Sequence, residues 1–237
     1  MVVDADGECV TARTDRRLFT IVGETHHTVA GLRVPLRLSA PDHETIDVAE
    51  PASDAIRVTV FGRAMRAIPA DDAAGDWVRA VVGRPDVTLV RVAEPRPLNP
   101  TYARAGDATA FADGYPVTLA SEASLAQVQR WMTEVSGESG NLPMDRFRPN
   151  LVVGGELDPF EEDAWGRVRV GTVTFRVAKG IDRCAMTILD PATLTTGPEP
   201  IRTLSRHRKW DGATWFGIQL IPDDAGSIAV GDHVIPR

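Results

Sequence analysis

The sequence has little cysteine, no long apolar run and no excess of positive charge. Its two cysteines, Cys9 and Cys184, form no C-x-x-C pair, which excludes a tetrathiolate zinc site and a self-contained iron–sulfur cluster and argues against a disulfide framework. No apolar stretch approaches the roughly 20 residues that span a bilayer, and no signal peptide is visible. The net charge of −7 argues against a nucleic-acid coat or a polybasic membrane anchor. We therefore expect a cytoplasmic protein without nucleic-acid or membrane partners.

The composition is that of an ordinary globular protein. The chain has 237 residues, of which 43% are hydrophobic and 25% charged, and it is long enough to bury a core without covalent staples. Its 20 glycines and 17 prolines are spread along the chain, which indicates many short elements and turns. The fold class we expect is mostly β with a few helices.

Short strands dominate the pattern of the first half. Apolar or alternating runs at 19–22, 32–34, 36–38 and 56–60 predict strands, and their spacing suggests a small barrel or sandwich. Trp77, Val78, Val81 and Val82 share a helical face that Gly83 would end, and a further strand is expected at 87–92. We expect an N-terminal β-rich domain over residues 1–93.

Three prolines fall within residues 94–100, so 94–112 is expected to be a linker or mobile loop before a second domain at 113–237. Within that domain a strand at 116–120 leads into a helix for which Ser121 is a plausible N-cap. Further strands are expected at 151–153, 186–189 and 228–234. A hairpin over 168–177 should turn near Gly171 and Thr172.

Three segments of the second half carry chemistry together: 121–125 (SEASL), 146–150 (RFRPN) and 182–184 (DRC). With them, the sequence resembles the MOSC family, and within it the amidoxime-reducing branch and its bacterial relatives. Further matching segments are Phe160–Trp165, Asp190-Pro191, Thr196-Gly197, Phe216-Gly217 and Gly226–Asp232. The resemblance covers residues 113–235 and implies a β-barrel-like MOSC domain after a smaller N-terminal β-rich domain.

The N-terminal half resembles the family's N-terminal β-barrel domain through Val3–Gly7 and Thr11–Arg13. The family normally has a further stretch before this point, with a Lys-Ser pair and an Asp-Arg pair that help to hold the cofactor phosphate. Neither pair is found here. A truncated chain, a mis-assigned start or a weakened hold on the cofactor would each explain the difference.

Cys184 is the candidate metal ligand and catalytic group. A thiolate is a soft ligand for a thiophilic metal, and the neighbouring Arg183 would favour deprotonation. From the residues alone, the commoner fate of a lone cysteine is burial as a small hydrophobe, which is the interpretation we give Cys9. The resemblance implies that Cys184 binds molybdenum beside the dithiolene sulfurs of the molybdenum cofactor (molybdopterin).

Arg148 and Asn150 are candidate cofactor-binding residues. A guanidinium fork matches a phosphate or pterin carbonyl, an Asn amide can both donate and accept, and Pro149 should hold Arg148 extended. A surface arginine and a turn asparagine are the alternative. Ser121 and Ser124 stand where a helix N-terminus could bind an anion, or where they merely cap it.

Asp182 and Arg183 are expected beside the metal, with Arg183 reaching the pterin or its phosphate. Arg146 is expected to be a surface charge, or one lying behind the cofactor contacts, and Glu161–Asp163 an acidic turn or helix start. The basic run 206–209 is either a docking patch for an acidic electron donor or a solvated loop.

The resemblance implies a molybdenum-dependent oxidoreductase that removes oxygen from small N-hydroxylated compounds. Because the cysteines cannot hold a cluster, its electrons would come from a separate donor protein of ferredoxin, flavoprotein or cytochrome type. Two alternatives stay open. One is a carrier of the cofactor or of sulfur, as in cofactor sulfurases, although 237 residues leave no room for a sulfurase's pyridoxal-phosphate domain. The other is a degenerate member that does no catalysis.

Overall fold

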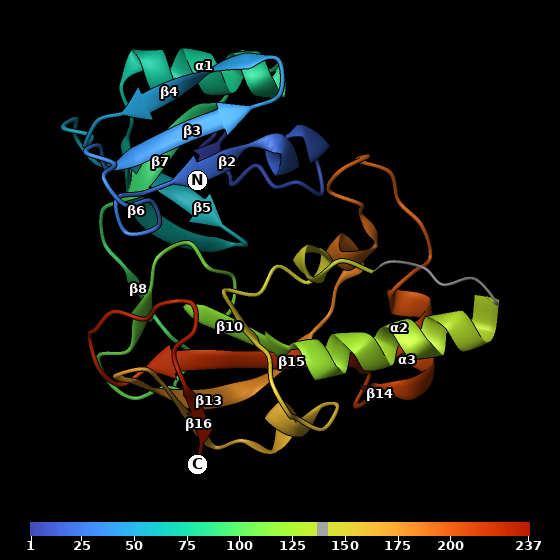
Figure 1. Cartoon of the computed structure of the whole chain (residues 1–237). Coiled ribbons are helices and arrows are strands. Elements are labelled where there is room, and N and C mark those ends of the chain that lie inside the picture. Colours follow the sequence, from blue (N-terminus) through green and yellow to red (C-terminus); the bar gives the residue numbers. More distant parts are fainter. Residues whose placement is uncertain (137–141) are drawn as a thin grey trace. The chain divides into compact units, whose positions relative to one another are not determined.

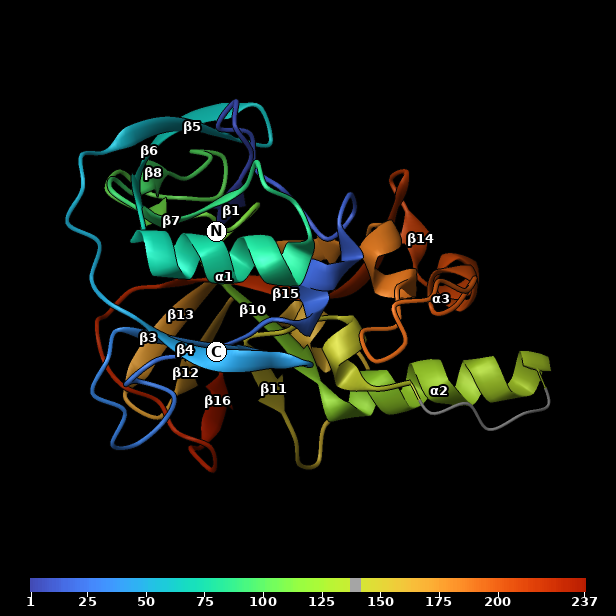
Figure 2. The same cartoon turned by 90° about the horizontal axis from the view of Figure 1, so that it is seen from above.

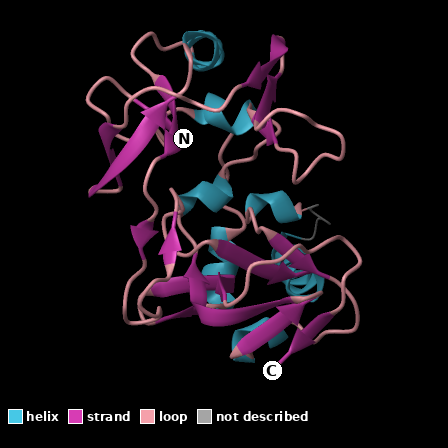
Figure 3. Cartoon of the chain, turned by 90° about the vertical axis from the view of Figure 1, so that its left-hand side faces the viewer, coloured by secondary structure: helices cyan, strands magenta, loops and turns pink. Residues whose placement is uncertain are grey.

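The computed structural model describes residues 1–136 and 142–237, which divide into two compact units. The first unit comprises Met1–Arg96 with Pro191–Leu194, and the second comprises Pro97–Asp190 with Thr195–Arg237. Strands outnumber helices in both (Figure 3), and the described residues form three α-helices. The predicted fold class, mostly β with a few helices, is confirmed.

The first unit holds a four-stranded sheet of order β1-β7-β6-β5 and a three-stranded sheet of order β2-β3-β4. The α1 helix packs against β4 and β7 (Figure 1). The elements are β1 (Val2–Val3), β2 (Val22–Glu24), β3 (Leu36–Ala40), β4 (His43–Val48), β5 (Ile56–Val60), β6 (Arg63–Pro69), α1 (Asp72–Val82) and β7 (Thr88–Val92).

The α1 helix follows the predicted apolar face. Asp71 caps its start by accepting a hydrogen bond from the backbone N–H of Ala74, and Gly83 ends it in a left-handed conformation. Val78 and Val82 are fully buried in the core of the unit. The predicted helix and its glycine cap are therefore confirmed.

Two expected strands of the first unit are wrong. Phe19 and Thr20 end a 3-10 turn at Arg16–Thr20, only Val22 of the expected strand lies in β2, and residues 32–34 lie outside any strand. The turn forms because the Asp15 carboxylate accepts from the backbone N–H of Arg17 at 3.1 Å and from its guanidinium at 3.0 Å. A local side-chain partner thus overrides the strand pattern.

The second unit is built on a sheet of order β11-β10-β15-β13-β12-β16, with β14 paired to β15; Figure 2 labels all of these strands. The predicted hairpin turning at Gly171 and Thr172 is confirmed as β12 and β13. The remaining elements are β8 (Arg96–Pro97), which starts at the last residue of the first unit's main segment, β9 (Ala108–Thr109), β10 (Val117–Ser121), α2 (Glu122–Ser136), β11 (Leu151–Val153), β12 (Arg167–Val170), β13 (Val173–Asp182), α3 (Ile201–His207), β14 (Lys209–Trp210), β15 (Ala213–Pro222) and β16 (Val234–Pro236).

The segment expected to be a linker is tied to the second unit. Its strands β8 and β9 pair with each other, and Asp107 accepts two hydrogen bonds from the guanidinium of Arg176 at 2.8 and 2.9 Å. Arg104 reaches Asp223 at 3.1 Å. These ion pairs fasten the segment from Pro97 onward, while the domain limits at 93 and 113 stay predictions.

Helices α2 and α3 lie side by side in the second unit (Figures 1 and 2). Between them and the sheet is a core that includes Val128, Phe147, Leu204 and Phe216. No helix of residues 1–136 and 142–237 is long and apolar enough to cross a membrane.

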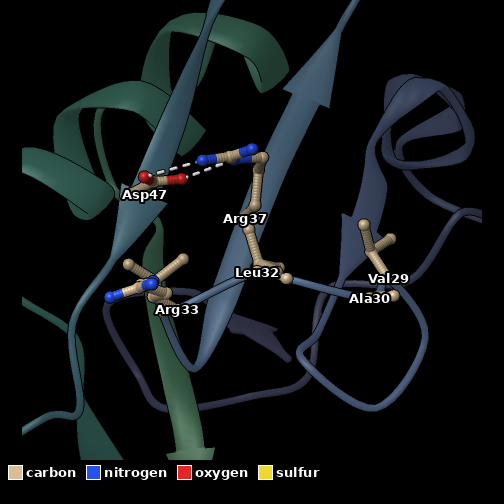
Figure 4. A pocket seen from close by; sticks show the side chains of 8 residues that line it. Val29, Ala30, Leu32, Arg33, Arg37 and Asp47 are labelled. Carbon is tan, nitrogen blue, oxygen red and sulfur yellow. Dashed lines mark hydrogen bonds and ion pairs between the residues drawn. The ribbon is translucent and has the colours of Figure 1, made fainter.

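A surface hollow of about 370 Å³ belongs to the first unit (Figure 4). It is lined by the loop Val29–Val34 and by Arg37 and Asp47, whose side chains face each other at 2.6 and 2.9 Å. None of the predicted site residues lines it, because all of them belong to the second unit.

Candidate metal and cofactor site

The site begins where β13 ends. Ile181 is buried, Asp182 is exposed, the guanidinium of Arg183 turns inward and Cys184 is exposed. Successive side chains of an extended chain point to opposite sides, so Asp182 and Cys184 share the solvent face. The exposed thiol contradicts the alternative of a buried packing cysteine for Cys184. Cys9, in the first unit, is half-buried, and burial raises its pKa.

Arg183 is an internal clamp. Its Nε donates to the carbonyl oxygen of Phe216 at 2.8 Å, and its Nη1 donates to that of Phe147 at 2.9 Å. The guanidinium lies 5.4 and 5.7 Å from the two ring centroids of these phenylalanines. Burial lowers the pKa of Arg183 to about 10, against the opposing effect of the Cys184 thiol, so the group remains a cation at neutral pH.

Gly217 makes room for this clamp. Its φ is +74°, and a Cβ there would lie 2.6 Å from the carbonyl oxygen of Leu119 and 3.2 Å from Nη2 of Arg183. The pairing of β13 with β15 shifts register here, between Gly180 and Asp182. A glycine is therefore required for both the conformation and the close approach.

The chain turns immediately after Cys184. Residues Ala185–Ile188 form a 3-10 turn, not the strand expected at 186–189. The Cys184 sulfur accepts from the backbone N–H of Met186 at 3.5 Å, and the Cys184 carbonyl accepts from the Thr187 hydroxyl at 3.0 Å. These local hydrogen bonds outweigh the apolar pattern that predicted a strand.

Arg146 lies against this turn. Of the two alternatives expected for it, the surface charge is wrong, and a charge lying behind the candidate cofactor contacts remains. Its side chain is only 11% exposed. Nε donates to the carbonyl oxygen of Thr187 and Nη2 to that of Glu199, both at 3.0 Å, while Nη1 lies 3.6 Å from the Asp190 carboxylate. Arg146 thus holds the segment that follows Cys184.

Arg148 and Asn150 are both exposed. Asn150 Oδ1 accepts from the backbone N–H and the hydroxyl of Thr118, each at 2.9 Å, and these two bonds leave its amide NH2 unused. Arg148 is not extended as expected but has a φ of +50°. Its N–H donates to the Asp145 carbonyl, which closes a turn that overrides the bias of Pro149.

Ser121 and Ser124 are fully buried with Glu162, which is also fully buried. Both hydroxyls donate to the Glu162 carboxylate, at 3.0 Å from Ser121 and 2.8 Å from Ser124. Ser121 Oγ also accepts from the backbone N–H of Ser124 at 3.1 Å, which confirms its predicted N-cap role. The chain's own carboxylate therefore stands at the helix N-terminus where an external anion was expected.

The clamp of Arg183 brings most of the predicted residues into one region. Its bond to Phe147 joins the segment of Arg148 and Asn150 to that of Cys184, and Asp182 accepts from the backbone N–H of Thr214 at 3.3 Å. Ser121 and Ser124 form a separate buried cluster. Sequence reasoning missed the burial of Glu162, although Phe160 and Trp165 on either side of the predicted acidic turn were a signal for it.

The basic run 206–209 is not a solvated loop. It ends α3 and begins β14, His207 stacks on Trp131 at 4.1 Å, and Arg208 pairs with Asp163. Arg206 and Lys209 remain exposed. A docking role for this run stays a prediction.

The region fits a metal cofactor held through one thiolate. Nη2 of Arg183 is buried without a hydrogen-bond partner among the described residues, and a buried N–H without a partner is a site of unmet donor capacity. Residues 1–136 and 142–237 contain no group of three His, Cys, Asp or Glu that could hold a metal by themselves. A metal here would therefore need ligands from a bound group besides Cys184.

Two family models match the chain. The model described as MOSC domain matches residues 106–235, which is more than half of the chain, and the MOSC N-terminal beta barrel domain matches residues 1–85. The chain is 27% identical to human mitochondrial amidoxime-reducing component 1 and 29% identical to rat mitochondrial amidoxime reducing component 2. Each alignment covers 99% of this chain and 71% of the relative. It is also 32% identical to rice molybdenum cofactor sulfurase, over 70% of this chain but only 22% of that protein.

Proposed function

Because the chain belongs to the MOSC family, we propose that it binds the molybdenum cofactor, with Cys184 as the protein's ligand to the metal. The observation that carries this proposal is the exposed Cys184 thiol at the end of β13, preceded by the buried clamp of Arg183. A thiolate is a suitable soft ligand for a thiophilic metal. The similarity to a protein named molybdenum cofactor sulfurase supports the choice of cofactor.

Three further residues would hold the organic part of the cofactor. Arg148 offers an exposed guanidinium for a phosphate, and Asn150 offers an amide NH2 for a pterin edge. The buried Nη2 of Arg183 is a donor for a group bound close to Cys184. Ser121 and Ser124 would act only through the helix terminus that they form, since their hydroxyls are engaged by Glu162.

We further propose that the protein is an oxidoreductase that reduces small N-hydroxylated compounds. Conversion of an amidoxime to an amidine and water consumes two electrons and two protons. The bound cofactor supplies the two-electron chemistry, and a separate donor protein of ferredoxin, flavoprotein or cytochrome type supplies the electrons. The similarity to two amidoxime-reducing components along 99% of this chain supports this reaction.

The chain's own residues would bind the cofactor and orient the substrate. The Cys184 thiolate anchors the metal, and the fixed positive charge of Arg183 lies on the inner side of the chain next to it. Asp182, on the same outer face as Cys184, presents a carboxylate that can accept the N–H groups of a bound amidoxime.

A single-turnover experiment tests the reductase proposal. Protein loaded with cofactor is reduced chemically, freed of reductant and mixed with benzamidoxime. We expect about one equivalent of benzamidine per loaded site, and none from Cys184→Ala. Reoxidation of the loaded protein without benzamidine would contradict the reductase role.

One observation favours a second function, namely carriage of the cofactor or of sulfur. This chain is 32% identical to a protein named molybdenum cofactor sulfurase, over 70% of this chain and 22% of that protein. A carrier would bind the cofactor and release it to an acceptor enzyme, with no benzamidine formed in the single-turnover experiment. Transfer of molybdenum to a cofactor-free acceptor would support the carrier.

A further inference from the structure

Both sides of Cys184 are held by the same two consecutive residues. On the N-terminal side, the carbonyl oxygen of Phe147 accepts from Arg183 at 2.9 Å. On the C-terminal side, the side chain of Arg146 donates to the carbonyl oxygen of Thr187 at 3.0 Å. The chain therefore meets the Arg146-Phe147 pair immediately before the thiol and again three residues after it.

The Arg146 side chain is built into this position. It is 11% exposed, and two of its three nitrogens face the segment that follows Cys184, at the Thr187 carbonyl oxygen and the Asp190 carboxylate. The third donates to the carbonyl oxygen of Glu199, further along the chain. A planar fork of this kind fixes the positions of several acceptors at once, which the single ammonium group of a lysine cannot do.

The segment that Arg146 holds, residues 184–190, is short and locally bonded. Its 3-10 turn is secured by the Cys184 carbonyl and sulfur, which accept from Thr187 and Met186. Backbone hydrogen bonds to residues 195–197 hold the end of the segment, through Asp190 N–H and the Ile188 carbonyl. A short 3-10 turn is weak by itself, and the guanidinium of Arg146 adds a charged donor at the carbonyl oxygen of Thr187.

We propose that Arg146 is a positioning residue that sets the direction of the Cys184 thiol relative to Arg148 and Asn150. Arg146 contacts the loop of Cys184, and its own chain leads directly to the two residues that would hold the organic part of the cofactor. Arg146 thereby fixes the position of the Cys184 thiol relative to the side chains of Arg148 and Asn150. This inference rests on the proposed binding of the molybdenum cofactor.

The test compares Arg146→Gln and Arg146→Lys with the control Arg169→Gln. Arg169 is a half-buried arginine of the same unit that also donates to a backbone carbonyl, that of Gly171 at 3.3 Å. Two readouts are independent of activity: hydrogen exchange of the Thr187 and Leu189 amides in full-length protein, and the electron paramagnetic resonance spectrum of the bound molybdenum after reduction by one electron to Mo(V).

We expect amide exchange in residues 184–190 of Arg146→Gln to be about tenfold faster or more, with exchange in β12 and β13 unchanged. Its molybdenum spectrum should show a shifted or second signal, and Arg146→Lys should lie between Arg146→Gln and wild type. Arg169→Gln should match wild type in the loop and in the spectrum.

Wild-type exchange and a wild-type spectrum in Arg146→Gln would overturn the inference alone. Absence of molybdenum from the wild-type protein would instead overturn the proposed function and this inference with it. Should Arg146→Gln fail to fold, Arg146→Lys decides by the same two readouts, with a wild-type result in both again counting against a positioning role.

Discussion

The guanidinium of Arg183 donates a 2.9 Å hydrogen bond to the carbonyl oxygen of Phe147, 36 residues earlier in the chain. A second bond from the same group reaches Phe216, on a third segment. One buried side chain therefore joins the loop of Cys184, the turn that carries Arg148 and the bulged strand β15. Arg183 is thus a structural clamp, whatever its role toward the proposed cofactor.

Replacing Arg183 with lysine should destabilise the second unit. A lysine ammonium cannot serve both carbonyls, so one buried acceptor would be left without a partner, at a cost of about 1–3 kcal/mol. Chemical denaturation of Arg183→Lys should show this loss. Arg167→Lys, an exposed change on β12, should be nearly neutral. Equal stability of the two variants would refute the clamp.

Gly217→Ala should be far more harmful than Gly212→Ala. Both glycines have a φ near +75°, but an added Cβ meets the Leu119 carbonyl at 2.6 Å only at Gly217, while at Gly212 nothing lies within 4 Å. We expect losses of about 2–4 kcal/mol at Gly217 and about 1 kcal/mol at Gly212. Thermal denaturation of the two variants measures the difference, and similar losses would mean that the close approach does not matter.

Glu162→Gln should weaken the start of α2. The amide NH2 of glutamine would face hydroxyl and N–H donors that now point at the carboxylate of Glu162, with an expected loss of about 2–3 kcal/mol. Glu161→Gln is the control, because Glu161 accepts one exposed hydrogen bond from Asp158. Denaturation curves that do not separate the two variants would speak against a buried, fully bonded carboxylate.

Acid should loosen the segment around Asp107. The backbone N–H of Arg104 and the guanidinium of Arg176 hold the pKa of Asp107 below its usual range despite some desolvation. Stability from a carboxylate with a lowered folded-state pKa is present above its unfolded pKa of about 4 and is lost as the pH falls through the folded value.

The measurement for Asp107 is the free energy of unfolding between about pH 2 and pH 7 for wild type and Asp107→Asn. Wild type should lose more stability than the variant below about pH 4. Parallel curves for the two proteins would show that Asp107 is not responsible.

The sequence predicted the elements whose signals are local and periodic. The α1 helix had an apolar face and a glycine at its end, and the β12–β13 hairpin alternated around Gly171. The expected strand at 186–189 was wrong because the backbone N–H of Met186 and the hydroxyl of Thr187 both donate to Cys184 within the turn. Such side-chain-to-backbone bonds leave no periodic trace.

For the candidate site, the sequence predicts residues whose binding role stays a prediction, and it does not predict their contacts. Four of the candidate residues are exposed, as a binding site requires: Arg148, Asn150, Asp182 and Cys184. The hydrogen bond from Arg183 to the Phe147 carbonyl joins the segment of Cys184 to the segment of Arg148. The Arg146 side chain is held by the backbone carbonyl oxygens of Thr187 and Glu199, which are distant from it in sequence. Every residue type has such a carbonyl. The amino-acid sequence therefore does not show which carbonyl oxygen will accept a hydrogen bond from a distant arginine.

The most direct measurement is the molybdenum content of purified full-length protein, in wild type, Cys184→Ala and Cys9→Ala. Cys9 is the matched control, since it is the second thiol of the chain and lies in the first unit. We predict about one molybdenum per chain in wild type and Cys9→Ala, and loss of most of it in Cys184→Ala with the fold retained. Equal molybdenum in all three proteins, or none in wild type, would contradict Cys184 as the metal ligand.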